Sequence, residues 1–491
     1  MERRLRDVLI ALALSGAFAL VMCTCNTPLG PSIGSDNAMY LTMGTALARG
    51  YAPYTQIFDH KGPLLFMLET LPQLFFGGYQ TVTVFLMEWG FLFGCLMALR
   101  DLCAQLGVRA AWVVQLGYLA LFAASVDGGN LSEEYANLFT LLGLCLAVRA
   151  FGGETMQRRL LIPAAGVGLC ATLCFLTRAN NALPLLGAVA GFTLYLVVKR
   201  AFRALGACAL GCLAGCLIAL VPTALWLQGY GALREAVYGA ILHNVMYSGA
   251  QGGSRMAMLF GSSYGALALL MAGLASLGAV AAFWRTRRAA MPLAMLMGAF
   301  AALTAAFISH KFYRHYLTLG APLAALGAAQ MLALLGEKRP GALRGTVCAA
   351  ALVCCAALGA QGYATNALRL SELESAQTFG QAAQALYAQV PEEDRDAFMA
   401  YRVEPKWYVA TKALPCMRFY FLQEILAQVD PAVMDEIVAT FESDPPRWLV
   451  LFYNRPFSPP YDERMREIFE TKYAFVDAQG EYQLLRLVQG E

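Results

Sequence analysis

Charged residues are scarce in this sequence, and long apolar runs take their place. Only 14% of the 491 residues are Asp, Glu, Lys or Arg, whereas 58% are hydrophobic. A soluble core cannot bury this much apolar surface, so the lipid bilayer must be the main solvent of the chain. The scarcity of charge therefore excludes a soluble globular protein and predicts an integral membrane protein.

Nucleotide-binding and metal-cluster motifs are absent as well. The sequence contains neither GxxxxGK(S/T) nor a strand-flanked GxGxxG, and the predicted cytoplasmic loops are too short to fold a nucleotide-binding domain. It has 14 cysteines but no CxxC pair, and Cys416 alone lies in the C-terminal tail, which leaves no disulfide to form there. The row Cys208, Cys212 and Cys216 has helical spacing, which favours close helix packing.

Eleven segments are long and apolar enough to predict transmembrane helices. They lie near residues 8–25, 80–99, 111–126, 132–150, 160–177, 182–198, 204–227, 260–284, 289–309, 315–335 and 345–363. We therefore expect an all-α polytopic membrane domain over residues 1–363. A small soluble α/β domain is expected over residues 364–491.

The apolar stretch from Leu64 to Gly78 is left out of this count. It has about 15 residues, contains Glu69 and Pro72, and falls short of a hydrocarbon core roughly 30 Å thick. We predict an amphipathic helix that lies at the outer membrane surface. The alternative is a short tilted span, which would invert the orientation of every later loop.

Lys and Arg are distributed unevenly among the predicted loops. With a cytoplasmic N-terminus, alternate loops carry 17 basic residues inside and 7 outside before the tail, as the positive-inside rule requires. Residues 366–491 carry a net charge of −8, and the preceding part carries +11. We therefore predict a multi-pass protein of the bacterial cytoplasmic membrane whose acidic tail lies outside the cytoplasm.

The tail has the pattern of a compact α/β module. Residues 370–389 predict a helix, residues 397–403 and 448–453 predict strands, and residues 473–476 and 482–487 predict two closing strands. Asp394-Arg395-Asp396 matches the Asp-x-Asp signal of metal and nucleotide-sugar sites. Its place in a charged turn argues against that role. Acceptor contact, gating and a purely structural cap remain alternative roles for the module.

Ionisable residues gather in the first predicted outer loop. Asp36 lies early in this loop, and Asp59, His60 and Lys61 lie late in it. Charged groups at a membrane boundary cost desolvation energy unless they are paired or functional. We therefore predict half of an active site here. Asp36 has a simpler alternative role, because it could close an Asx turn or cap the next helix.

Two further outer segments carry charges of interest. Glu133 and Glu134 open the fourth span, where they could serve catalysis or simply oppose the helix dipole. Arg178 lies outside against the positive-inside trend, which favours an anionic partner.

Glu88 lies inside the second span, where an acid normally faces the bundle interior. Arg178 is a hypothetical partner for Glu88.

All four histidines, His60, His243, His310 and His315, lie in or beside predicted outer loops. The segment 309–316 also contains Lys311, Arg314 and Tyr316. An aromatic belt with snorkelling bases is the structural alternative for this segment. Because one short loop holds more cationic and titratable groups than anchoring requires, we predict a substrate-binding role.

Several short motifs in this order resemble the GT-C superfamily of membrane glycosyltransferases. The resemblance is closest to the bacterial branch of protein O-mannosyltransferases and lipid A aminoarabinose transferases. It covers roughly the first 335 residues and rests on an early Asp in the first outer loop and on the motifs Gly50–Tyr54, Asp59–Leu65, Gly129–Tyr135, Thr177–Asn180 and Tyr313–Tyr316.

The resemblance implies transfer of a sugar from a polyprenyl-phosphate donor to an envelope lipid, protein or glycan at the outer face. A phosphate leaves as an anion without prior protonation, so a single carboxylate base suffices. Asp36 is the expected base, which deprotonates the acceptor hydroxyl and leads to inversion at the anomeric carbon. Glu134, with Glu133 as the less favoured neighbour, is expected to orient the sugar or the acceptor.

A donor phosphate also requires cations and polar neighbours. The outer side offers Lys61, Arg178, Lys311, Arg314, His315 and Tyr316. The family usually has an acidic residue before this lysine, whereas His60 occupies that place here and Asp59 stands one residue further back. Asp59 and His60 are therefore expected either to orient Lys61 or to hold a divalent metal ion, and the need for a metal stays open.

Two other functions compete with a transferase. A transporter or flippase of lipid-linked sugars would also need spans, outer cations and the intramembrane Glu88, but the two halves show no convincing duplication. An envelope-polymer ligase or polymerase usually concentrates its arginines in a large late outer loop, whereas the large outer loop here is the first. No nucleic-acid partner is expected.

Overall fold

The computed structural model describes residues 2–75, 77–151, 160–249, 253–308, 311–338, 349, 353–364, 373–452 and 461–488. Its contacts divide the chain into two compact units. Unit 1 comprises Met1–Leu29, Phe85–Trp226 and Ser248–Arg369, and unit 2 comprises Gly30–Val84, Leu227–Tyr247 and Leu370–Glu491. Unit 2 thus contains the first predicted outer loop as well as the tail. The boundary at residue 363 stays a prediction for the limit of the membrane domain.

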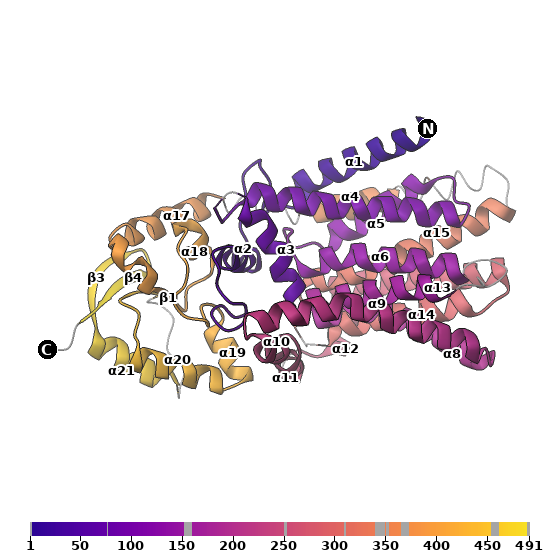
Figure 1. The fold of residues 1–491 in the computed structure, drawn as a ribbon. Coiled ribbons are helices and arrows are strands. Elements are labelled where there is room, and N and C mark those ends of the chain that lie inside the picture. The colour runs from indigo at the N-terminus through magenta and orange to yellow at the C-terminus, as the bar shows by residue number, and fades with distance from the viewer. Residues whose placement is uncertain are drawn as a thin grey trace. The chain divides into compact units, whose positions relative to one another are not determined.

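Unit 1 consists of helices (Figure 1). They are α1 Glu2–Met22, α4 Thr81–Gln105, α5 Ala111–Ser125, α6 Ser132–Phe151, α7 Leu161–Thr177, η1 Ala179–Ala182, α8 Leu183–Val198, α9 Phe202–Gly229, α12 Arg255–Gly261, α13 Ser263–Thr286, α14 Ala290–Phe307, η3 Arg314–Gly320 and α15 Ala321–Lys338. A further helix covers Val353–Ala364.

Eight of the described helices are long and apolar enough to cross a membrane. Three further predicted spans coincide with shorter apolar helices, Ala111–Ser125, Leu161–Thr177 and Val353–Ala364. Over its described residues, each predicted span therefore corresponds to a helix, and the polytopic α-helical fold class with a small C-terminal sheet is confirmed. Helices suit this solvent because they satisfy their backbone N–H and C=O groups internally.

Small residues allow the helices of unit 1 to approach closely. A Cβ on Gly278 of α13 would lie 2.2 Å from the Cα of Gly327 in α15, and a Cβ on Gly168 of α7 would lie 2.2 Å from the carbonyl oxygen of Cys212 in α9. Cys216 Sγ donates to the Gly168 carbonyl at 3.6 Å. The cysteine row of α9 therefore packs against α7, as small residues do between membrane helices.

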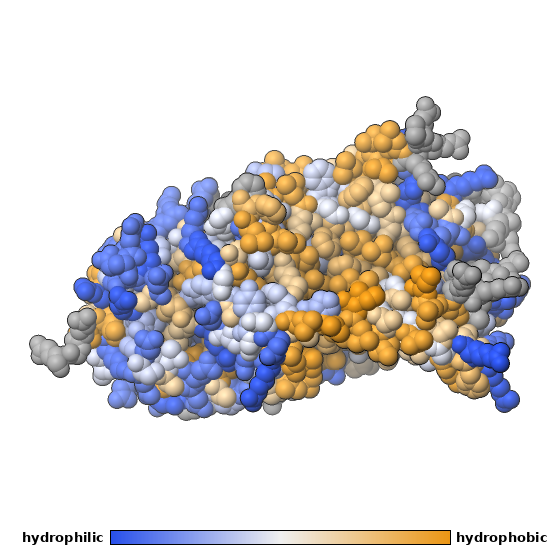
Figure 2. All heavy atoms as spheres, in the orientation of Figure 1, coloured by the Kyte–Doolittle hydropathy of each residue, from blue (hydrophilic) through white to orange (hydrophobic). Residues whose placement is uncertain are grey.

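The surface of unit 1 is apolar where its helices face outward. Helix α9 exposes Leu210, Leu213, Ile218 and Leu225, and Figure 2 shows apolar side chains gathered over this helix. Such a continuous apolar surface is stable in lipid rather than in water. The chain is therefore a multi-pass membrane protein, as predicted.

Unit 2 combines helices with one sheet. Its helices outside the tail are α2 Ser35–Ala48, α3 Pro63–Leu74, α10 Leu233–Val237, η2 Tyr238–His243 and α11 Asn244–Gly249, the last of which extends past the unit's boundary. The 64–78 stretch thus forms the 12-residue helix α3, whose location at the membrane surface stays a prediction. Helices α2 and α3 pack closely, because a Cβ on Gly44 would lie 2.4 Å from the Glu69 carbonyl oxygen.

The tail contains the predicted strands and helices. They are α17 Leu373–Tyr387, η4 Glu392–Ala397, β1 Phe398–Tyr401, α18 Lys406–Thr411, α19 Gln423–Val429, α20 Ala432–Ser443, β2 Trp448–Phe452, α21 Tyr461–Lys472, β3 Tyr473–Gln479 and β4 Tyr482–Leu487. The sheet order is β1-β2-β4-β3, with β1 parallel to β2 and the other pairs antiparallel.

Helices cover both faces of this sheet (Figure 1). Phe398 and Tyr401 stand three residues apart on β1, so their side chains point to opposite faces. The Phe398 ring contacts Tyr387 of α17, whereas the Tyr401 ring contacts Phe441 of α20 and Phe469 of α21. The tail is therefore a three-layer α/β/α module, built around buried aromatic side chains.

Candidate active site

The 54–62 loop, residues Tyr54 to Gly62, carries the polar residues that stand late in the first predicted outer loop. Tyr54 has a positive φ of 62°, and its N–H donates to the Ile57 carbonyl at 2.8 Å, which closes a tight turn. The Tyr54 hydroxyl donates to the Lys61 carbonyl at 2.7 Å and fixes the far end of the loop. Pro63 then begins α3, at a position where proline removes no helical hydrogen bond.

Asp59 orients Lys61 through the backbone. Its Oδ1 accepts the Lys61 N–H at 2.8 Å, which is the geometry of an Asx turn. The same oxygen lies 3.7 Å from Lys61 Nζ and 3.8 Å from His60 Nδ1, and Lys61 Nζ lies 3.4 Å from His60 Nε2. All three residues are buried. Of the two predicted roles of Asp59 and His60, this arrangement supports the orientation of Lys61.

Helix α2 carries Asp36 in its first turn, where the residue is half-buried. The N-cap residue is Gly34, which leaves the alternative of Asp36 as the capping residue without support. Tyr40 lies four residues later, so Asp36 and Tyr40 share one face of the helix. Lys61 Nζ lies 5.7 Å from the centroid of the Tyr40 ring, a cation–π distance. The 54–62 loop thus brings the lysine ammonium to the ring of Tyr40, about one helical turn along α2 from Asp36.

Residues 227–247 pack on the other side of His60. The His60 ring centroid lies 5.7 Å from that of His243 and 5.7 Å from that of Tyr247, and Asn244 Nδ2 donates to the His60 carbonyl at 2.6 Å. A π-helical segment, Tyr238–His243, directly precedes Asn244. Its wider turn changes the direction in which the side chains of this segment point. Sequence reasoning gave no role to Tyr40, His243, Asn244 or Tyr247, and the adjacent His243-Asn244 pair was the only available signal.

His243 is neutral at physiological pH. Burial lowers the pKa of its imidazole from 6.5 to about 4, the Asp430 carboxylate opposes this change in pKa, and the Lys61 ammonium adds to it. The side chain is fully buried against the rings of Phe58, His60 and Tyr238. Lys61 therefore supplies the positive charge of this region without a second cation at His243.

In unit 1, Arg178 has an anionic partner within the chain. Its Nη1 donates to Glu133 Oε1 at 3.0 Å, its Nη2 donates to the Tyr316 hydroxyl at 2.9 Å, and its guanidinium carbon lies 4.7 Å from the Tyr316 ring centroid. Ser132 Oγ donates to Glu133 Oε2 at 3.0 Å. The structure thus brings together three of the predicted site residues, Glu133, Arg178 and Tyr316, in a buried network.

Glu88 of α4 is held by amide donors rather than by Arg178. Asn26 Nδ2 donates to Glu88 Oε2 at 3.0 Å, and the backbone N–H of Asn130 donates to Glu88 Oε1. Because Arg178 is bonded to Glu133, the hypothesis of an Arg178–Glu88 pair is wrong. Glycine at position 129 is required by this contact, since its φ is +93° and a Cβ there would lie 2.5 Å from Glu88 Oε1.

Glu134 lies with Glu88 and Cys23. The ligand atoms of these three buried residues lie within 4.8 Å of one another. In the part of the chain that the structure describes, they form the one group of three side chains suited to a metal ion. Two carboxylates this close repel each other unless they share a proton or a cation. Asp59 and His60 belong to no such group among the residues that the structure describes.

The segment 311–316 combines aromatic rings and bases. His315 stacks on Tyr313 with ring centroids 5.6 Å apart, and its Nδ1 lies 3.8 Å from Asp127 Oδ2. Arg314 Nε donates to the Ala124 carbonyl at 2.6 Å. Burial lowers the pKa of the Lys311 ammonium. Ser309 and His310, which the sequence places in the same cluster, lie outside the described residues.

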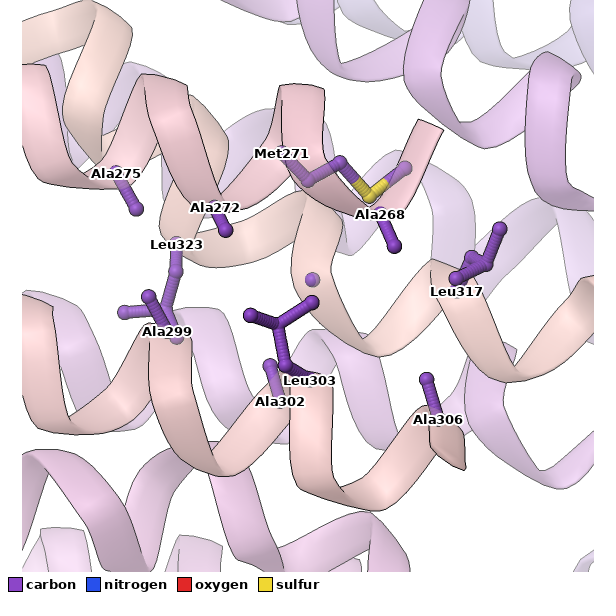
Figure 3. Close-up of a pocket in the computed structure, with 11 residues that line it drawn as sticks. Ala268, Met271, Ala272, Ala275, Ala299, Ala302, Leu303, Ala306, Leu317 and Leu323 are labelled. Carbon is purple, nitrogen blue, oxygen red and sulfur yellow. The ribbon is translucent and has the colours of Figure 1, made fainter. Parts of the chain in front are cut away.

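An apolar pocket lies next to this segment (Figure 3). Its walls include Ala268 and Met271 of α13, Ala299 and Ala302 of α14, and Leu317. Leu317 belongs to η3, the same short helix that begins with Arg314. A hydrocarbon-lined pocket therefore adjoins a turn that carries cationic side chains.

Asp394 serves the tail's own structure. It pairs with Arg447, and it accepts the indole N–H of Trp448 at 2.9 Å. These contacts lower the pKa of the Asp394 carboxyl, the Trp448 hydrogen bond most of all. The geometry supports the prediction that the Asp-x-Asp match is not a nucleotide-sugar site.

The fold is similar to those of solved membrane glycosyltransferases. ArnT from Cupriavidus metallidurans, solved with bound undecaprenyl phosphate, matches with a TM-score of 0.61 at 14% identity over 97% of both chains. The oligosaccharyltransferase of Archaeoglobus fulgidus, solved with a tethered acceptor peptide, matches with a TM-score of 0.56 at 12% identity over 98% of this chain and 74% of its own.

These likenesses establish the fold alone, because the identities are low. Both neighbours are GT-C superfamily members, so the predicted resemblance to that superfamily is confirmed at the level of the fold. No family model and no curated protein sequence matches the chain significantly.

Proposed function

We propose that this chain is a glycosyltransferase that moves a sugar from a polyprenyl-phosphate donor to a cell-envelope acceptor. The observation that carries the proposal is the approach of the Lys61 ammonium to the face of α2 that bears Asp36, within a 54–62 loop held by its own hydrogen bonds. A buried cation that contacts a helix bearing a half-buried carboxylate suits a reaction in which an anionic phosphate leaves while a hydroxyl loses a proton.

Asp36 acts as the general base in this proposal. It takes the proton of the acceptor hydroxyl as the hydroxyl oxygen attacks the anomeric carbon. The bond from that carbon to the phosphate oxygen breaks, and the electron pair leaves with polyprenyl phosphate. The product has the inverted configuration. Asp36 ends protonated, and the phosphate gains one negative charge, which the Lys61 ammonium stabilises.

Asp59 and His60 support Lys61 rather than react. The Asx turn at Asp59 sets the direction of the lysine backbone, and His60 Nε2 lies 3.4 Å from the ammonium. The neighbouring His243 is neutral, so it adds no second positive charge next to His60. In this arrangement the Lys61 ammonium is the cation offered to an external anion.

In unit 1, we assign lipid contacts to the segment 311–316. Lys311 and Arg314 supply positive charge for an anionic headgroup, with His315 and Tyr316 beside them, and the small alanine-lined pocket at Leu317 offers an apolar contact to the lipid. The neighbour ArnT was solved with undecaprenyl phosphate, which is a lipid of this class. Glu134 is assigned to orienting the sugar or the acceptor, while Glu133 and Arg178 stabilise the bundle around it.

The reaction is placed at the outer face of the bacterial cytoplasmic membrane, with the N-terminus inside and the tail outside. The asymmetry of 17 inside against 7 outside bases supports this orientation. An alkaline phosphatase fused after Glu491 is expected to be active in intact cells. An inactive fusion, with an active cytoplasmic reporter at the same position, would reverse the orientation.

A transport assay and a cleavage assay on the same proteoliposomes test the proposal. Wild-type protein is expected to release free polyprenyl phosphate from sugar-labelled polyprenyl phosphate when an envelope extract supplies acceptors. The label should appear on the acceptor. If the intact labelled lipid instead crosses the bilayer with no release of polyprenyl phosphate, the chain is a flippase and the proposed function fails.

A further inference from the structure

The tail contacts α2 at Glu404, which accepts the Ser35 hydroxyl at 3.1 Å. A second segment of the tail contacts both α2 and the 54–62 loop, all within unit 2. This crossing segment, Ala413–Tyr420, runs without helix or strand between α18 and α19. The Tyr79 hydroxyl donates to the Ala413 carbonyl, the Phe58 N–H donates to the Arg418 carbonyl at 3.0 Å, and the Tyr420 hydroxyl donates to the Met39 carbonyl at 3.1 Å. Phe58 directly precedes Asp59, and Met39 directly precedes Tyr40.

Arg418 makes the largest set of contacts in this segment. Its Nε lies 2.7 Å from Glu436 Oε1, and its Nη1 lies 3.4 Å from Glu235 Oε2. Its guanidinium carbon lies 4.4 Å from the ring centroid of Phe419 and 5.7 Å from that of Phe58. Only a planar guanidinium can bond two carboxylates through its fork and also lie over aromatic faces.

These contacts link Arg418 to the loop that carries Lys61. The rings of Phe58 and Phe419 meet edge to face with centroids 5.0 Å apart, and both are buried. The ion pairs fix the guanidinium, the guanidinium lies against the Phe58 ring, and the Phe58 N–H is bonded to the Arg418 carbonyl. The position of residue 58 is therefore set from the tail, one residue before the Asx turn that orients Lys61.

We propose that Arg418 is a positioning residue, through which the C-terminal tail holds the 54–62 loop with Lys61 facing the Asp36 side of α2. The inference rests on the proposed function and assigns the tail a part in the reaction. Arg418 does not touch the reacting atoms. Its effect on the rate is indirect: without Arg418 the Lys61 ammonium would be misplaced, and misplacing a binding group by about 1 Å can lower the rate as much as 100-fold.

The first test measures the loop itself and does not depend on catalysis. Hydrogen exchange of the full-length protein in nanodiscs is followed by mass spectrometry for peptides that cover residues 54–62. Arg418→Ala is expected to raise exchange in this loop at least fivefold, and Arg418→Lys should raise it less. Arg464→Ala is the control, because Arg464 pairs with Asp435 at 2.9 Å on the exposed tail surface. Unchanged exchange in Arg418→Ala would overturn the proposal.

The second test is a double-mutant cycle with Lys61→Met. In the wild-type background, Arg418→Ala is expected to lower kcat/KM for the lipid-linked sugar about tenfold. In the Lys61→Met background, the same change should lower kcat/KM less than twofold, because the positioned cation is already gone. A merely structural tail predicts the same fold-loss in both backgrounds, and that result would refute positioning.

A third variant covers the case in which Arg418→Ala does not fold. Phe58→Leu removes the ring beneath the guanidinium but keeps both ion pairs of Arg418. It should also raise hydrogen exchange in the 54–62 loop. Its effect on kcat/KM should not add to the effect of Lys61→Met. The proposal is wrong if Phe58→Leu and Arg418→Lys both leave the loop unchanged. The proposed function fails separately if wild-type protein cleaves no lipid-linked sugar while Arg418 still governs loop exchange.

Discussion

Each unit holds a buried base beside an acid, but the two pairs are built differently. In unit 1, Arg178 contacts Glu133 at 3.0 Å and the Tyr316 hydroxyl at 2.9 Å. In unit 2, Lys61 Nζ lies 3.7 Å from Asp59 and 3.4 Å from His60. No carboxylate lies within hydrogen-bond distance of this ammonium in the described part of unit 2. A closed ion pair stabilises the fold, whereas a loosely paired cation keeps its capacity for an external anion.

The largest expected effect concerns the closed pair. Arg178→Met leaves Glu133 buried without its cation, so the free energy of unfolding should fall by about 3–5 kcal/mol. The measurement is the thermal midpoint of the detergent-solubilised protein. Arg149→Met is the matched control, because Arg149 contacts Asp101 at 3.2 Å with both side chains more than half exposed. Its loss should cost under about 1 kcal/mol. Equal midpoints for the two variants would contradict the comparison.

The second effect is a pH dependence that originates in unit 2. Burial lowers the pKa of His243 from 6.5 to about 4, so the unfolded chain binds a proton between these values that the folded chain does not. Stability is therefore full above pH 6.5 and is lost as the pH falls toward 4, by about 3 kcal/mol. His243→Gln should flatten the dependence of the thermal midpoint on pH in this range. An unaltered slope would show that His243 does not titrate as described.

The third effect separates binding from stability. Lys61→Met should lower kcat/KM for a polyprenyl-phosphate sugar by roughly 100-fold, because the leaving phosphate loses its cation. The thermal midpoint should change much less than in Arg178→Met. Lys406→Met is the control, since Lys406 pairs with Glu404 at 3.2 Å on the half-exposed surface of the same unit. A destabilised but fully active Lys61→Met protein would reverse the roles assigned to the two pairs.

The smallest effect concerns Asp394 in the tail. Asp394→Asn should change kcat less than twofold and leave the thermal midpoint nearly unchanged, because its partners Arg447 and Trp448 belong to the tail. The reaction is measured with and without a divalent chelator. A large loss of activity that added metal restores would revive the Asp-x-Asp interpretation.

Much of the fold followed from local sequence patterns. Apolar length predicts helices in a bilayer because an α-helix satisfies the polar groups of its own backbone, and each predicted span is helical over the residues that the structure describes. Period-two patterns and turn residues likewise placed β1, β2, β3 and β4. The exclusion of residues 64–78 also agrees with the short helix α3, which Pro72 and Glu69 make a poor span.

The site was less accessible to sequence reasoning, because its contacts join distant segments. Lys61 and Asp59 stand out as charges in an apolar chain, but Tyr40 and Tyr247 do not differ from ordinary aromatic residues. The partner of Glu88 was missed since neutral amides from Asn26 and Asn130 replace a cation. Arg178 was noticed because it is a basic residue in an outer loop, against the positive-inside trend. The sequence alone could not show that Glu133 neutralises its charge.

Asp36→Asn tests the central claim most directly, because it removes the base and keeps the shape. Binding of the lipid-linked sugar and release of polyprenyl phosphate are measured on the same nanodiscs. We predict unchanged binding and a release rate lowered about 1,000-fold, the range expected for loss of a general base. Release at the wild-type rate would contradict the assignment of Asp36 and, with it, the catalytic role of the α2 face beside Lys61.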